Sequence, residues 1–350
     1  MELAKINTKY YCGIDLHSRK MYVCVMDRDG RIYYHRNMQN DFDEFKRAVE
    51  KYLPNMSVGV ESMHSYYWLA DCCIEANIPF YLGHAYYMKT IHGGKKKNDK
   101  IDSKKIADLM RSNHLPIGYV YPKEMRAARD LLRRRHRYMR IRSEAYTHIQ
   151  TIFRQQCVNI TGKDIKNSEA REKLLTWFDN PEINSSIEAN LDIIEFLNPM
   201  INKLERQIRA KAKEFDRTTL NLLLTVPGIG EMLSLNILYE IGKIERFKSA
   251  QKFSSYCRLV KCERESGGKK YRSKNQKIGN PYLKWSIGEI IIHAARTSPV
   301  INKHYERLIS RYGKGKAKSI ISHKFGVAIY YMLKNKEAFD EDRFVRGMME

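Results

Sequence analysis

The first 113 residues alternate between β-type and helix-type segments, and this order constrains the fold more than any other feature. Three short apolar segments follow one another at Tyr10–Asp15, Met21–Met26 and Arg31–His35. The residues Asp27-Arg28-Asp29-Gly30 between the last two predict a tight turn, so these two segments are expected to pair as a hairpin. The chain therefore opens with three consecutive strands.

A helix–strand alternation follows these three strands. Apolar residues at helical spacing predict a helix over Phe42–Tyr52. Beyond it the sequence predicts in turn a strand, a helix, a strand and a helix at Ser57–Glu61, Tyr66–Ala76, Pro79–Leu82 and Asp102–Asn113. Three strands followed by this alternation is the element order of a ribonuclease-H-like α/β domain.

From about Pro122 the sequence becomes long, charged and helical. Glu124–Gln156 contains neither Pro nor Gly, and Leu191–Phe215 carries apolar residues at the spacing of a packing seam. The two helices could pair as an antiparallel hairpin or as a dimeric coiled coil. Between them, Asn159–Ser186 is polar and is expected to be an irregular connector with a short helix.

A third region, Leu220–Glu350, is helical but interrupted by glycines. We therefore expect three parts: an α/β domain over residues 1–122, a helical region over 123–216 and a mainly helical C-terminal domain over 217–350. A chain of 350 residues has room for such an arrangement.

The charge balance points to a polyanionic partner. The chain has 63 Lys and Arg against 40 Asp and Glu, a formal net charge of +23. There is neither an apolar run of membrane-spanning length nor a segment of signal-peptide type. Nucleic acid is therefore preferred over a membrane, with a cytoplasmic, nucleoid-associated location. The seven irregularly spaced cysteines are expected to be reduced thiols, mostly in the core, rather than zinc ligands.

Four acidic residues form the leading candidate site. Asp15 ends the first predicted strand, Glu61 ends the Ser57–Glu61 strand, and these strands are neighbours in a ribonuclease-H-like sheet. Asp99 and Asp102 lie three residues apart at a helix start and can face one direction. The competing interpretation is that all four are ordinary surface acids. Carboxylates that converge repel one another unless cations neutralise them, and Mg²⁺ or Mn²⁺ with oxygen ligands suits phosphoryl transfer.

Basic residues near this cluster and in the first long helix predict contacts to phosphate. The run from Arg133 to Arg142 holds six arginines in ten residues, on all sides of the helix and with almost no acid to balance them. The residues expected to contact nucleic acid here are Lys95, Lys96, Lys97, Arg133, Arg134, Arg135, Arg137 and Arg140.

Two glycine-containing loops offer further phosphate contacts. Val226–Gly230 (VPGIG) resembles a helix-hairpin-helix turn, and Glu265–Lys270 (ESGGKK) presents Ser266 beside two glycines. An interhelical turn and a basic hairpin loop are the plainer alternatives. Ser266 could be a nucleophile, although the sequence shows no base to activate it. The candidate nucleic-acid-binding residues of this region are Gly228, Gly230, Lys269, Lys270, Arg272 and Lys277.

With these residues in place, the chain resembles the insertion-sequence-110 family of transposases, which are bridge-RNA-guided recombinases. Most of the chain is covered, in order and with matching rough spacing. The matching segments are Gly13-Ile14-Asp15-Leu16-His17, Val60-Glu61, Asn98-Asp99-Lys100-Ile101-Asp102, Ile106-Ala107, Pro227-Gly228-Ile229-Gly230, Ile244-Glu245-Arg246-Phe247, Ser266-Gly267-Gly268-Lys269 and Lys277-Ile278-Gly279-Asn280.

The resemblance implies a RuvC-like N-terminal domain, a coiled-coil region and a C-terminal transposase domain. It implies that Asp15, Glu61, Asp99 and Asp102 bind Mg²⁺ and that Ser266 forms a covalent phosphoserine link to DNA. The active site would then be composite, within one subunit or across subunits. The implied partners are donor and target DNA, a noncoding bridge RNA and further copies of the chain, as a homodimer or homotetramer.

One segment departs from the family pattern. Cys257-Arg258-Leu259-Val260-Lys261 stands where such proteins usually have a Gly-Leu-Val-Pro element, which predicts a different shape for the loop before Ser266. Two other functions stay open. One is a RuvC-like junction nuclease that hydrolyses DNA with water, and the other is a non-catalytic nucleic-acid-binding scaffold.

Overall fold

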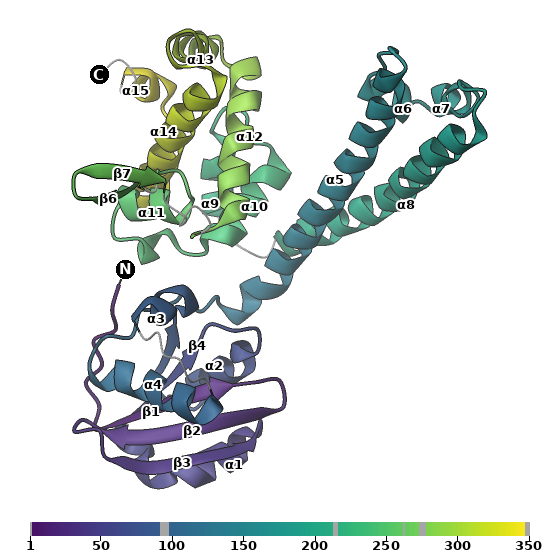
Figure 1. Ribbon diagram of the computed structural model, residues 1–350. Helices are drawn as coiled ribbons and strands as arrows, with labels where there is room; N and C mark the ends of the chain where they lie inside the picture. Colours follow the sequence, from purple (N-terminus) through teal and green to yellow (C-terminus); the bar gives the residue numbers. More distant parts are fainter. Residues whose placement is uncertain (1, 92–97, 213–215, 262, 273–277, 347–350) are drawn as a thin grey trace. The chain divides into compact units, whose positions relative to one another are not determined.

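The computed structural model describes residues 2–91, 98–212, 216–261, 263–272 and 278–346. The chain divides into two units, Met1–Lys123 and Glu124–Glu350. In the first unit a five-stranded sheet has the order β3-β2-β1-β4-β5 (Figure 1). Strands β1, β2 and β3 are antiparallel, and β4 and β5 run parallel to β1. Their bounds are Tyr10–Leu16, Lys20–Asp27, Ile32–Gln39, Met56–Glu61 and Phe80–Gly83.

Helices cover both faces of this sheet. Apolar residues of α1 and α2 pack on one face, together with Ile14 and Val60, and α4 packs on the other face against Tyr11 and Cys24. All the expected strands and helices are present, and α3 is an addition that the sequence did not predict. The helices are α1 (Phe42–Val49), a 3-10 segment (Glu50–Asn55), α2 (Tyr66–Glu75), α3 (Ala85–Ile91) and α4 (Asp99–Arg111).

Two glycines let α4 lie close to the sheet. Gly13 and Gly59 are register partners on the parallel strands β1 and β4. A Cβ at Gly13 would lie 2.3 Å from the backbone nitrogen of Ala107 and 2.3 Å from the carbonyl oxygen of Ser103, both on α4. No side chain fits between the strand and the helix at this point. The glycine of the Gly-Ile-Asp segment therefore sets the distance from the sheet to the helix that carries Asp99 and Asp102.

Two long helices of the second unit run antiparallel to each other. Bonds between them join His148 to Asn190 at 2.9 Å and Arg142 to Asn198 at 2.7 Å. Residue numbers increase along α5 while those of the bonded partners in α8 decrease, so the two helices are antiparallel. They form a hairpin within one chain. Two short helices lie at the end of this hairpin (Figure 1). The four helices are α5 (Lys123–Gln155), α6 (Gly162–Lys166), α7 (Ser168–Leu175) and α8 (Pro181–Ala212).

The rest of the second unit packs helices around one apolar core, which includes Phe253, Ile287 and Phe325. In the part of the chain that the structure describes, no helix is long and apolar enough to cross a membrane. Of the six cysteines that the structure describes, four are buried free thiols, as expected, and Cys262 lies outside the described residues. The elements are α9 (Arg217–Leu224), α10 (Glu231–Ile241), a 3-10 segment (Ile244–Arg246), α11 (Ala250–Tyr256), β6 (Glu263–Ser266), β7 (Lys269–Arg272), α12 (Pro281–Thr297), α13 (Pro299–Tyr312), α14 (Lys314–Asn335) and α15 (Glu341–Arg346).

Candidate active site

Strand β1 directs Asp15 toward the start of α4. Side chains alternate between the two faces of a strand, and Tyr11 and Gly13 lie on the α4 face of the sheet. Asp15 continues this alternation on the same face, two residues further along. Its side chain is 16% exposed. The first predicted acid is therefore mostly buried, at the end of its strand, as the sequence indicated.

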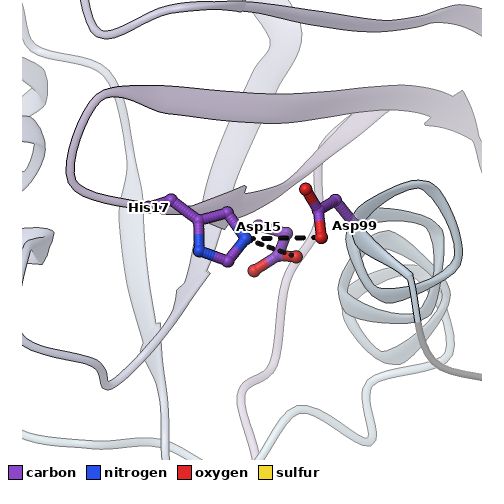
Figure 2. Close-up of side chains that lie close together, drawn as sticks. All are labelled: Asp15, His17 and Asp99. Carbon is purple, nitrogen blue, oxygen red and sulfur yellow. Dashed lines mark ion pairs between the residues drawn. The ribbon is translucent and has the colours of Figure 1, made fainter.

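His17 contacts two of the predicted acids. Its Nε2 atom is 3.4 Å from Oδ2 of Asp15 and 3.4 Å from Oδ1 of Asp99 (Figure 2). Ligand atoms of these three residues all lie within 4.8 Å of one another. His17 ends the Gly-Ile-Asp-Leu-His segment, but it was not among the predicted site residues. Its position two residues after Asp15, on the same side of the strand end, was the available signal.

The first turn of α4 supplies the other two aspartates. The side chain of Asn98 accepts a hydrogen bond from the backbone N–H of Ile101 at 2.8 Å, which caps the helix at Asp99. The helix therefore begins at Asp99 rather than at Asp102, and both acids fall in its first turn. Asp102 also contacts Lys105 at 3.4 Å. Asp108, further along α4, pairs with Arg111 at 2.7 Å and does not join the cluster.

Glu61 ends β4 beside Asp15. The parallel register pairs Gly13 with Gly59 and Ile14 with Val60. Continuing this register by one residue would bring Asp15 opposite Glu61. Because a Cβ at Gly59 would meet the side chain of Met110 on α4, alternation along β4 places Glu61 on the same face as Asp15. The expected neighbouring strand ends are thus present.

The pKa of Asp15 reflects the negative charges around it. Burial raises the pKa of Asp15 above its ordinary value, His17 opposes this rise, and the charges of Asp99 and Asp102 add to it. A cation placed among these groups would favour the ionised carboxylate. Carboxylate oxygens and one imidazole nitrogen are ligands that suit a divalent metal ion. Asp15, His17 and Asp99 therefore fit a metal site, whereas Glu61 and Asp102, although predicted as ligands, are not part of this group of converging ligand atoms.

The predicted serine lies at a hairpin turn in the second unit. Ser266 is the last residue of β6 and pairs with Lys269 of β7. Gly267 and Gly268 have φ values of +59° and +74°, which a two-residue hairpin turn requires and glycine adopts without strain. The side chains of Ser266, Lys270 and Arg272, and all of Lys95, Lys96, Lys97 and Lys277, lie outside the described residues.

The segment Cys257–Lys261 contains a left-handed backbone position. Arg258 has a φ of +56°, a conformation that glycine adopts without strain. Its Nε atom donates a hydrogen bond to the carbonyl oxygen of Gly279 at 2.8 Å. The chain thus holds an unfavourable backbone conformation and uses the arginine side chain to bind the far end of the loop.

The expectation that almost no acid balances the arginine-rich helix is wrong for three of its arginines, two of which bind acids far away in the sequence. Arg133 binds the buried carboxylate of Glu240 through Nε at 2.6 Å. Arg135 binds Glu205 of α8 at 2.7 Å. These two guanidinium groups hold helices together, and their acid partners lie 107 and 70 positions away in the sequence. The exposed arginines of the predicted set are Arg134, Arg137 and Arg140, of which Arg140 contacts Glu144 at 3.3 Å.

The VPGIG turn joins α9 to α10, as expected. Gly228 has a φ of +85°, and a Cβ there would lie 2.4 Å from the backbone nitrogen of Ala294. Close packing against α12 therefore explains this glycine without a phosphate. Gly230 caps α10 and faces open space. Lys269, after the serine turn, is exposed.

Comparison with known proteins connects these features. Residues 12–158 match the family model of DEDD transposases of the IS110 type, and residues 220–306 match the model described as Transposase IS116/IS110/IS902 family. The transposase for insertion sequence element IS1111A of Coxiella burnetii is 22% identical over 93% of this chain and 90% of its own length. A protein named for the IS117 mini-circle of Streptomyces coelicolor is 30% identical over 37% of this chain and 31% of its own. With the acid cluster at the sheet edge and the serine hairpin in the second unit, these matches show that the chain belongs to the IS110 family of transposases.

Proposed function

We propose that this transposase cleaves and exchanges DNA strands with a composite site. One half consists of Asp15, Glu61, Asp99 and Asp102 on a RuvC-like domain, and the other half is Ser266. The observation that supports this best is the meeting of Asp15 with the first turn of α4, where burial and the neighbouring carboxylates raise the pKa of Asp15. Mg²⁺ or Mn²⁺ bound there would neutralise this negative charge and polarise the scissile phosphate.

The serine supplies the covalent step of the proposal. The Oγ atom of Ser266 attacks the phosphorus, a phosphoserine bond forms, and the bond from phosphorus to one deoxyribose oxygen breaks. The hydroxyl proton passes to solvent or to a nearby base, and the departing strand keeps the deoxyribose oxygen. A second DNA hydroxyl then attacks the phosphoserine and restores the serine, so that strands are exchanged without a net loss of phosphodiester bonds.

The proposed partners are donor DNA, target DNA and a noncoding bridge RNA that pairs with both. The net charge of +23 favours nucleic acid of either kind. Exchange of one strand from each of two duplexes requires two cleaved phosphates, and exchange of both strands requires four. With one Ser266 in each subunit, this supports a homodimer or a homotetramer. If RNA purified with the native protein has no segments complementary to the element's ends and insertion site, the guidance proposal fails.

A trapped adduct tests the serine mechanism. Wild-type protein with Mg²⁺ and cognate DNA is expected to give a denaturant-resistant protein–DNA adduct that Ser266→Ala lacks. If cleavage persists in Ser266→Ala without an adduct, the chain is instead a nuclease that uses water. If Asp15→Asn binds DNA normally and exchanges strands at the wild-type rate, the acid cluster is not part of the active site.

A further inference from the structure

Glu240 is a buried carboxylate to which the proposed chemistry gives no role. Among the residues that the structure describes, it is the only Asp, Glu, Lys or Arg that is fully buried, with none of its surface exposed. It belongs to α10, and its neighbours in that helix are mostly apolar and buried. A buried charge is costly unless it is paired and hydrogen-bonded, so the arrangement around Glu240 requires an explanation.

Three side chains donate hydrogen bonds to this carboxylate. Arg129 of α5 reaches Oε2 at 3.0 Å, and Arg133, one turn later, binds both oxygens at 2.6 and 2.9 Å. Asn280 donates its Nδ2 to Oε2 at 2.7 Å. Burial raises the pKa of Glu240, but the bond from Arg133 and the charges of both arginines bring it below its ordinary value. The group is therefore an anion held by three donors from two other segments.

Asn280 connects this anion to the two ends of the segment between Tyr256 and Asn280 that contains the serine hairpin, and we call these two ends its base. Its backbone N–H donates to the carbonyl oxygen of Tyr256, the last residue of α11, at 2.6 Å. Its Oδ1 accepts from the backbone of Tyr282 and Leu283 and caps α12. The adjacent Gly279 accepts the bond from Arg258. The two ends of the segment that contains β6 and β7 are thus fastened together, next to Glu240.

We propose that Glu240 is a positioning residue: through Asn280 it ties the base of the serine hairpin to helix α5. The inference rests on the proposed role of Ser266. A buried ion pair contributes little net stability compared with an apolar replacement, but it fixes one geometry. The hairpin turn itself is glycine-rich and exposed, so its position depends on how firmly its base is held. The paired arginines of α5 supply that support.

A substitution at Asn280 separates positioning from stability. Asn280→Ser keeps an oxygen that can cap α12 and removes the donor to Glu240. Ser298→Ala is the matched control, because Ser298 caps α13 in the same unit by accepting from Ile301 at 3.1 Å and binds Glu341 rather than Glu240. We expect similar losses of melting temperature in both variants. The rate of adduct formation from bound DNA should fall about tenfold or more in Asn280→Ser and stay within about twofold of wild type in Ser298→Ala.

Amide hydrogen exchange gives a second readout that needs no reaction. Exchange in Glu263–Arg272 should be faster in Asn280→Ser than in wild type or Ser298→Ala. Equal adduct rates in the two variants, or unchanged exchange in this hairpin, overturn the inference. The Ser266→Ala protein separates the two proposals: an adduct in that variant refutes the serine mechanism, whereas its absence together with a wild-type rate in Asn280→Ser refutes only the role of Glu240.

Discussion

At the residue scale, two cross-strand glycines determine how closely α4 approaches the acid-bearing strands. An added methyl group at Gly13 meets helix backbone, whereas at Gly59 it meets the Sδ atom of Met110, 2.3 Å away at the end of a flexible side chain. We expect Gly13→Ala to lower the free energy of unfolding by about 1–3 kcal/mol, as overpacking does, and Gly59→Ala to cost less. Urea denaturation measures both. Gly162→Ala, where nothing lies within 4 Å, is the control; an equal loss there would refute the packing argument.

The raised pKa of Asp15 predicts a pH-dependent stability of the metal-free protein. The folded state binds the Asp15 proton more tightly than the unfolded state, whose pKa is near the ordinary 3.8. Ionisation of Asp15 therefore lowers the free energy of unfolding as the pH rises above that value. Asp15→Asn should melt at a higher temperature than wild type at pH 7, and the difference should narrow toward pH 4. A variant that melts lower at pH 7 would contradict this.

The same comparison tests the metal site. Titration with Mg²⁺ or Mn²⁺ should raise the melting temperature of the wild-type protein, because a ligand that binds only the folded state stabilises it. The increase should be absent or much smaller in Asp15→Asn, and EDTA should reverse it in the wild type. Equal increases in the two proteins would place the bound ion elsewhere.

Arg258 has a strained left-handed backbone and a side chain that binds Gly279. Two substitutions distinguish the effect of the strain from that of the bond. Both Arg258→Gly and Arg258→Ala remove the bond to Gly279, but only alanine keeps a Cβ in the left-handed conformation. The glycine variant should therefore be more stable than the alanine variant by about 1 kcal/mol. Thermal melting of the two proteins measures the difference. Equal stabilities would mean that the backbone changes its conformation once the arginine is removed.

The position of a single residue could be predicted from the sequence where it depends on the residue's own strand or helix. Asp15 and Glu61 end predicted strands, and strand order alone placed them side by side. Glu240 was missed because its partners, such as Asn280, lie far away in the sequence. His17 was missed although Asp15 lies only two residues before it, and its contact with the distant Asp99 could not be read from the sequence. The spacing of apolar residues does not encode such pairings.

At the element scale, α5 separates into arginines that hold the fold and arginines that face solvent. Arg134 and Arg137 are exposed, so we expect the Arg134→Gln/Arg137→Gln protein to keep its stability within about 0.5 kcal/mol. Its DNA affinity should fall, and the slope of log affinity against log salt should become shallower by about 0.9 for each phosphate that the variant no longer neutralises. Arg133→Gln should instead reduce stability by about 3 kcal/mol, because Glu240 stays buried with fewer partners. If the Arg134→Gln/Arg137→Gln protein lost stability and Arg133→Gln lost only DNA affinity, the assignment of these arginines to DNA binding and to the fold would be wrong.

Element boundaries were predicted less well than element types. Helix α8 begins at Pro181 rather than Leu191, and proline in the first turn is a helix-start signal that apolar spacing alone does not register. The seven residues of α3 are too few to show a period, so that helix was missed. The pairing of α5 with α8 inside one chain needed cross-helix bonds such as Arg142 to Asn198, which periodicity cannot supply. The boundary expected at residue 216 stays a prediction.

At the scale of the whole molecule, the two halves of the proposed site belong to different units of the chain. The acids lie in Met1–Lys123 and Ser266 lies in Glu124–Glu350. Each half can therefore be inactivated without altering the other, and the site can be completed within one subunit or between two. Mixing Asp15→Asn and Ser266→Ala proteins distinguishes these arrangements. A mixed dimer with sites shared between subunits contains one intact site and one doubly altered site.

We expect the mixture to recover adduct formation that neither protein shows alone. Because the two halves of the site belong to different units of the chain, the acids of one subunit can act together with Ser266 of another subunit. Sites completed within single subunits would leave every site with one altered half, so the mixture would stay inactive. The adduct in the active mixture should be attached to the Asp15→Asn chain, which alone carries Ser266, and a size tag on that chain would identify it. An adduct on the Ser266→Ala chain would refute the serine mechanism itself, since that chain has no hydroxyl at position 266.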